Sequence, residues 1–98
     1  MIFLSNESDF NLNKEKVCVF FYNKNQPFCD IAMSSIAELD GNITIYIVDI
    51  INFKNMITRF NLVSTPTFIL FKDKRERRRF HQIQLLEKNI KEVFYVWR

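Results

Sequence analysis

Two cysteines, Cys18 and Cys29, are the side chains of this sequence whose chemistry is most distinctive. Cys29 ends the run Gln26, Pro27, Phe28, Cys29, which directly follows a polar loop. Pro27 suits the first position of a helix because the N–H that proline lacks would be unpaired there. Cys29 is therefore expected in the first turn of a helix, where the helix dipole favours the thiolate. A thiolate is the form of cysteine that attacks disulfide bonds.

A disulfide between the two cysteines is not expected. Cys18 lies early in a predicted strand, and Cys29 lies beyond the far end of that strand. From Cys18 to Tyr22 the strand already extends by roughly 13 Å, at ~3.3 Å per residue. A disulfide requires Cα atoms within about 7 Å of each other. We therefore expect Cys18 to be a small buried core residue, as free cysteines usually are.

The basic charge of the chain is concentrated in residues 72–79. This segment holds six basic and two acidic side chains, a local charge of +4, so the remainder of a chain of net charge +3 carries −1. Such a segment is typical of a contact surface for nucleic acid or for an acidic protein. The alternative is a solvated hairpin whose charges protect an exposed sheet edge. The six basic side chains are Lys72, Lys74, Arg75, Arg77, Arg78 and Arg79.

The elements that must position these residues begin with short N-terminal pieces, a strand over residues 2–4 and a brief helix over residues 7–12. Residues 17–22 form an unbroken apolar run of β-branched and aromatic types, which predicts a strand buried on both faces. The spacing of apolar residues then predicts a helix over residues 27–40. Gly41 is expected to end this helix as a left-handed cap.

The second half continues the alternation of strands and helices. Residues 43–48 predict another buried strand, and residues 53–60 carry apolar side chains at the spacing of a two-turn amphipathic helix. A strand over residues 67–71 is expected to turn back, through the charged segment, into a strand around residues 77–83. A helix with Leu86, Ile90, Val93 and Trp97 on one face ends the chain. This order predicts parallel pairing through crossovers, followed by an antiparallel hairpin.

Length and composition indicate a single domain over residues 1–98. Apolar residues make up 48% of the chain, enough for a core. No apolar run is as long as a transmembrane helix, and the first residues lack the pattern of a signal peptide, so we expect a cytoplasmic protein with no membrane contact. His81, the only histidine, has no metal-ligating neighbours and is expected to be incidental. We expect neither a metal nor a cofactor.

In its chain order and in three stretches the sequence resembles the thioredoxin family. FFYNKNQPFC stands where the family has a strand and a Cys-x-x-Cys helix start, ITIYIVD matches an aliphatic strand, and STPTFILFK matches the cis-proline motif with its following strand. The resemblance covers almost the whole chain and implies an α/β, thioredoxin-like fold, with a central mixed β-sheet flanked by helices. It also implies a cis Thr65–Pro66 bond facing residues 26–29, with the backbone of Thr65 exposed as a strand edge for partner peptides.

The sequence departs from the family at the residues that do the chemistry. Gln26 stands where the family has its nucleophilic first cysteine, and Phe20 stands at the position of a buried acid. Dithiol–disulfide exchange requires an attacking thiolate and a resolving thiol, so this activity is not expected. The resemblance implies that the second cysteine is shielded, so both an inert thiol and a working monothiol remain open for Cys29. The Trp before the first cysteine maps to Asn25, and the late glycines map to Lys74 and Gln82.

The resulting hypothesis is a degenerate thioredoxin-like protein that binds or scaffolds a larger partner protein, as a subunit of a complex. The contact would be the groove formed by Gln26, Pro27, Phe28, Cys29, Thr65 and Pro66, or the basic hairpin. One alternative is a monothiol thiol–disulfide oxidoreductase that uses Cys29. A second is a component of the spliceosome, because NQPFC and YIVDI resemble the spliceosomal branch of thioredoxin-like proteins and an arginine-rich surface would suit an RNA-rich assembly. Against this second alternative, STPT is similar to ordinary thioredoxins.

Overall fold

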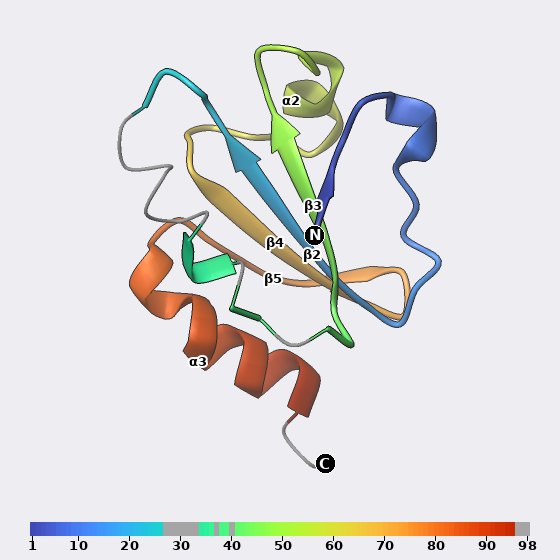
Figure 1. Ribbon diagram of the computed structural model, residues 1–98, viewed down its shortest axis with the longest axis vertical. Coiled ribbons are helices and arrows are strands. Elements are labelled where there is room, and N and C mark those ends of the chain that lie inside the picture. The colour runs from blue at the N-terminus through green and yellow to red at the C-terminus, as the bar shows by residue number, and fades with distance from the viewer. Residues whose placement is uncertain (27–33, 37, 40, 96–98) are drawn as a thin grey trace.

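The computed structural model describes residues 1–26, 34–36, 38–39 and 41–95. Within these residues, five strands form one sheet in the order β1-β3-β2-β4-β5 (Figure 1). β1 and β2 run parallel to β3, whereas β4 runs antiparallel to both β2 and β5. The predicted α/β fold with a mixed sheet is thereby confirmed. The strands are β1 (Ile2–Phe3), β2 (Lys16–Tyr22), β3 (Thr44–Asp49), β4 (Thr67–Lys72) and β5 (Arg75–Phe80).

β2 is the centre of the sheet, as its apolar run predicted. Residues 17–21 are fully buried because β3 and β4 pair with the two edges of β2 while other elements cover both faces. Cys18 and Phe20 point into the core on one face of the sheet, and Val17, Val19 and Phe21 point into the core on the other. This alternation follows from the two-residue period of a strand.

Helical elements cover both faces of the sheet. α3 lies across one face, where Leu86, Ile90 and Phe94 join the core around Phe20 (Figure 1). α2 packs on the other face through Met56. Residues 34–36 are helical, whereas residues 27–33 of the predicted helix over residues 27–40 lie outside the described residues. The helical elements are η1 (Glu7–Asp9), α2 (Asn55–Arg59), η2 (Ile83–Leu85), α3 (Leu86–Ile90) and η3 (Lys91–Tyr95).

Two predicted helices differ from the structure. The helix expected over residues 7–12 is only the single 3-10 turn η1, and the side chain of Asn6 makes no capping hydrogen bond to it. The C-terminal helix is present but not uniform, because a 3-10 turn (η2) precedes α3 and a π-helical turn (η3) follows it. Val93 packs against the core as predicted, while Trp97 lies outside the described residues.

The expected left-handed cap at Gly41 is wrong, because Gly41 does not have a positive φ. The N–H of Glu38 donates to the carbonyl of Ser35 (3.3 Å), and the N–H of Leu39 donates to that of Ile36 (3.0 Å). These bonds, three residues apart, form tight turns that take the chain out of the helix before it reaches Gly41. No left-handed residue is therefore required at that position.

The second strand of the C-terminal hairpin begins earlier than predicted. Asp73 and Lys74 have φ values of 53° and 72°, and Lys72 pairs with Arg75 across them. Two consecutive residues with positive φ make a two-residue type I′ turn, which reverses the chain at once. The charged segment is therefore not a long loop, and β5 (Arg75–Phe80) consists largely of its arginines. The strand was expected around residues 77–83, which is too late, because the turn is only two residues long and not a longer loop.

Candidate functional site

The candidate groove begins where β2 ends. Asn23 follows β2, and its carbonyl accepts a hydrogen bond from the N–H of Gln26 (2.9 Å). Its side-chain oxygen also accepts from the N–H of Asn25 (2.9 Å), forming an Asx turn. These two bonds hold Gln26 close to the carboxyl end of the central strand. The neighbouring candidates Pro27, Phe28 and Cys29 lie outside the described residues.

The second part of the candidate site is the segment before β4. The Thr65–Pro66 peptide bond is cis. β4 pairs antiparallel with β2 so that Thr67 lies opposite Phe21, near the end of β2. This register brings the two walls together, and the hydroxyl of Thr65 donates a hydrogen bond to the side-chain oxygen of Gln26. Two stretches separated by 39 positions in the sequence are thus in direct contact.

The backbone N–H and C=O of Thr65 are free to bind a partner peptide. Within the described part of the chain, neither its N–H nor its C=O makes a hydrogen bond. Thr65 is only partly exposed, whereas Val63, two residues before it, is 87% exposed. A free donor and acceptor beside an exposed apolar side chain are the groups with which an extended peptide pairs in β-addition.

Sequence reasoning missed His81, which belongs to this region. Its Nδ1 lies 3.1 Å from the hydroxyl of Thr67 and 3.3 Å from the carbonyl of Pro66. The Thr67 hydroxyl already donates to the carbonyl of Ser64 (2.6 Å), so it accepts from His81 and the hydrogen is on Nδ1. In the neutral form of the ring, Nε2 is then the nitrogen that can accept a hydrogen bond. A hairpin register that pairs Phe68 with Phe80 also sets Thr67 opposite His81. Pairing these two phenylalanines in the sequence would therefore have predicted the position of His81.

Phe20 belongs to a row of stacked aromatic rings in the core. Phe20 stacks on Phe68 with ring centroids 4.8 Å apart, and Phe68 stacks on Phe80 at 4.9 Å. Tyr22, two residues further along β2, also stacks on Phe20 at 5.7 Å. These four rings, which we call the aromatic column, cross β2, β4 and β5. Their apolar packing offers no group that accepts a proton at the position of Phe20.

Cys18 is a free, fully buried thiol, which confirms the expected core position. Burial in apolar surroundings raises the pKa of its thiol from 9.0 to about 12, because the charged thiolate would lose its hydration. At neutral pH the side chain is therefore protonated and a poor nucleophile. Cys18 behaves as a small apolar residue of the core.

The basic residues of the hairpin do not form one continuous surface. A β-bulge lies in β5 where Leu70 pairs with Arg78 and Phe71 pairs with Glu76, which leaves Arg77 as the extra residue. Arg78 therefore points toward α3, where its guanidinium donates to Asn89 (2.7 Å) and to Glu92 (2.6 Å).

Arg79 points to the opposite face, where it pairs with Glu76 (2.9 Å) and donates to the carbonyl of Asn61 (3.2 Å). The side chain of Arg77 donates a hydrogen bond to the carbonyl of Lys72 (3.4 Å) and has no ion-pair partner among the described residues. Lys74, Arg75 and Arg77 are exposed. A polyanion approaching this edge strand would thus meet three exposed basic side chains, whereas two arginines are already engaged within the fold.

Neither a metal site nor a membrane span emerges from the residues that the structure describes. Their histidine, cysteine, aspartate and glutamate side chains do not gather in a group of three or more that could hold an ion. None of the helices among them is both long enough and apolar enough to cross a bilayer.

Comparison with known proteins finds similarity in structure and not in sequence. No family model matches the sequence, and no curated protein matches it. Among solved structures, thioredoxin O2 from Arabidopsis thaliana superimposes with a TM-score of 0.85 at 20% identity, covering 95% of this chain and 93% of that one. Mitochondrial thioredoxin 3 from Saccharomyces cerevisiae gives 0.84 at 23% identity, covering 95% of both chains. Thioredoxin from Plasmodium falciparum gives 0.85 at 18% identity, covering 93% and 95%.

Proposed function

Because this chain has the thioredoxin fold, we propose that it is a protein-binding module that holds an extended segment of a partner protein in the groove between Gln26 and Thr65. It does not catalyse dithiol–disulfide exchange. That reaction needs an accessible thiolate to attack the disulfide, and the amide of Gln26 has no such nucleophile. The aromatic column also lacks the carboxylate that could accept a proton from Cys29.

The observation that carries this proposal is the hydrogen bond between Thr65 and Gln26. It joins the two walls of the groove through side chains, so the groove keeps a defined shape. At this position the chain has a hydrogen-bonding amide and not a reactive thiol. Thr65 meanwhile retains a backbone N–H and C=O with no partner among the described residues. A peptide strand that pairs with these groups gains main-chain hydrogen bonds without any covalent chemistry.

Site-specific photo-crosslinking tests which surface binds the partner. A photoreactive phenylalanine analogue is placed at the exposed Val63, two residues before Thr65, in one variant and at Arg75, in the exposed basic hairpin, in the other. Both variants keep the hydrogen bond between Gln26 and Thr65, and we expect one discrete protein adduct from position 63 and none from position 75. Adducts of RNA or of protein from position 75 alone would instead favour the basic hairpin, as in the spliceosomal alternative, and would contradict the groove.

Two further measurements separate binding from redox activity. The purified protein is expected not to reduce insulin disulfides faster than free dithiol does, and a rate well above that background that disappears in Cys29→Ser would favour the monothiol alternative. Gln26→Cys is expected to form an intramolecular disulfide with Cys29 on mild oxidation, measured by mass spectrometry after alkylation. Two separately alkylated thiols in that variant would contradict the thioredoxin-like arrangement of residues 26–29.

A further inference from the structure

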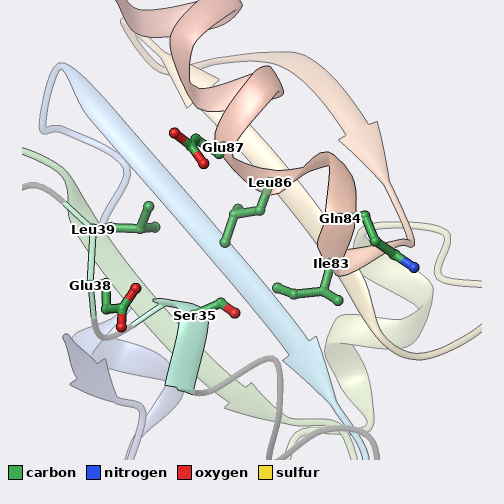
Figure 2. A pocket seen from close by; sticks show the side chains of 7 residues that line it. All are labelled: Ser35, Glu38, Leu39, Ile83, Gln84, Leu86 and Glu87. Carbon is green, nitrogen blue, oxygen red and sulfur yellow. The ribbon is translucent and has the colours of Figure 1, made fainter.

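A pocket lies between residues 35, 38 and 39 on one side and the turn η2 with the start of α3 on the other. Its volume is about 460 Å³, within the range of small-ligand pockets, ~300–1,000 Å³. Figure 2 shows Leu39 facing Ile83 and Leu86 across the pocket, and these three side chains give it an apolar floor. Its polar lining consists of Ser35, Glu38, Gln84 and Glu87.

The two glutamates of the pocket come from opposite walls and are both unpaired. Glu38 follows the helical residues 34–36, and Glu87 lies in the first turn of α3. Among the described residues, neither carboxylate has a hydrogen-bond or ion-pair partner. The ion pairs of the described chain are made instead by Glu92 and Glu76. The pocket therefore carries two carboxylates without an ion-pair partner among the described residues, on a protein whose net charge is +3.

We propose that this pocket receives a lysine side chain from a segment of a partner protein. The aliphatic stem of the lysine lies along Leu39, Ile83 and Leu86, and its ammonium group lies near the carboxylates of Glu38 and Glu87. Long basic side chains bury their stems on apolar surface and keep the charged end in a polar setting. One lysine side chain therefore matches both parts of the pocket: its ammonium group matches the two carboxylates, and its aliphatic stem matches the apolar floor.

The chemistry of the lining favours lysine over other cations. A metal ion such as Ca²⁺ takes six to eight oxygen ligands, and three apolar side chains occupy the floor where such ligands would be needed. An arginine is best matched by one carboxylate that accepts its planar fork in two parallel bonds. Glu38 and Glu87 belong to separate segments and offer two separate carboxylates, which suits the three divergent donors of an ammonium group.

The pocket is a different site from the groove, although the two adjoin. Ile83 follows two residues after His81, whose ring contacts the carbonyl of Pro66. Two residues span at most about 7 Å of extended chain. The two sites are thus neighbours along the chain, and the affinity of the pocket for lysine does not depend on the groove being a binding site.

A peptide titration followed by NMR tests the proposal. The probe is acetyl-Ala-Leu-Lys-Leu-Ala-amide, and the matched control is the same peptide with its lysine acetylated. We expect saturable shifts of the methyl groups of Leu39, Ile83 and Leu86 with the first peptide. Two exposed charge pairs together contribute about tenfold in affinity, so acetylation of the lysine should weaken binding by about that factor.

Paired variants show whether the two glutamates are responsible. Glu38→Gln combined with Glu87→Gln should weaken binding of the lysine peptide about tenfold. Glu7→Gln combined with Asp9→Asn changes the net charge equally at η1, which is remote from α3 (Figure 1), and should leave the affinity unchanged. Equal binding of the acetylated peptide, or equal weakening in both variants, would overturn the proposal. Binding of free spermidine without binding of the peptide would overturn the assignment to a protein partner.

Discussion

Replacing Phe20 by alanine should remove a large part of the stability of this protein. Phe20 is 0% exposed and stacks on both Tyr22 and Phe68 in the aromatic column. Burial of a phenylalanine side chain contributes ~1.5–3 kcal/mol, and each aromatic pair adds ~0.5–1.5 kcal/mol. The sum agrees with the cost of about 3–5 kcal/mol that phenylalanine-to-alanine changes in cores show. Small domains are stable by only ~5–15 kcal/mol, so Phe20→Ala should be severely destabilised.

Urea unfolding followed by circular dichroism measures this cost. The matched control is Phe3→Ala in β1, because Phe3 is 55% exposed and its loss should cost less than about 1 kcal/mol. Phe20→Leu retains most of the apolar volume and should fall between the wild type and Phe20→Ala. If Phe20→Ala were destabilised by no more than Phe3→Ala, the packing of the aromatic column described above would be wrong.

The same position tests how this core responds to a buried acid. Phe20→Asp buries a carboxyl group among apolar side chains, which raises its pKa in the folded state because burial disfavours the charged form. Below the unfolded pKa of about 3.9 the group is neutral in both states, and above it only the unfolded state ionises freely. Phe20→Asp should therefore lose stability steadily as pH rises above about 4, whereas Phe20→Ala should not. If the free energy of unfolding of the two variants changed with pH in the same way, water would have access to this site and its burial as described would be wrong.

Three further predictions concern the turn, the buried thiol and the α3 contact. Lys74→Gly should raise the free energy of unfolding by about 1 kcal/mol in urea melts, because Lys74 has a φ of 72° that costs a non-glycine residue ~1–2 kcal/mol. Cys18 should resist iodoacetamide at pH 8 until the protein unfolds, and its raised pKa should make stability fall as pH rises from 9 toward 12, since only the unfolded state releases the proton there. A double-mutant cycle of Arg78→Ala and Glu92→Ala should give a coupling below about 1 kcal/mol that decreases with salt, because both side chains are more than a third exposed.

Much of this protein could be derived from its sequence because local patterns carry the information. The unbroken apolar runs that became β2 and β3 identify strands buried on both faces wherever they occur. That Gln26 carries no nucleophile is a matter of residue type alone. The order of elements then allowed few topologies, and the observed mixed sheet is among them.

Turn geometry was harder to predict because a turn depends on very few residues. The pair Asp73 and Lys74 lacks the glycine that usually marks a type I′ turn, so β5 was predicted to start late. Gly41 was assigned the left-handed role that glycine often has, yet the chain had already turned at Glu38 and Leu39. In both cases the packed strands and helices determined where the chain reverses, and the local residue types did not.

The contacts that define the candidate sites were decided by tertiary structure alone. His81 meets Pro66 and Thr67 only because the β4–β5 hairpin has one particular register. The bulge at Arg77 sends Arg78 toward α3 and Arg79 to the other face, so a continuous basic segment in the sequence becomes two separate sets of ion pairs. Side chains alternate along a strand with a period of two, so one extra residue exchanges the faces of all that follow. The sequence determines which side chains are available, but only pairing between strands decides which of them meet.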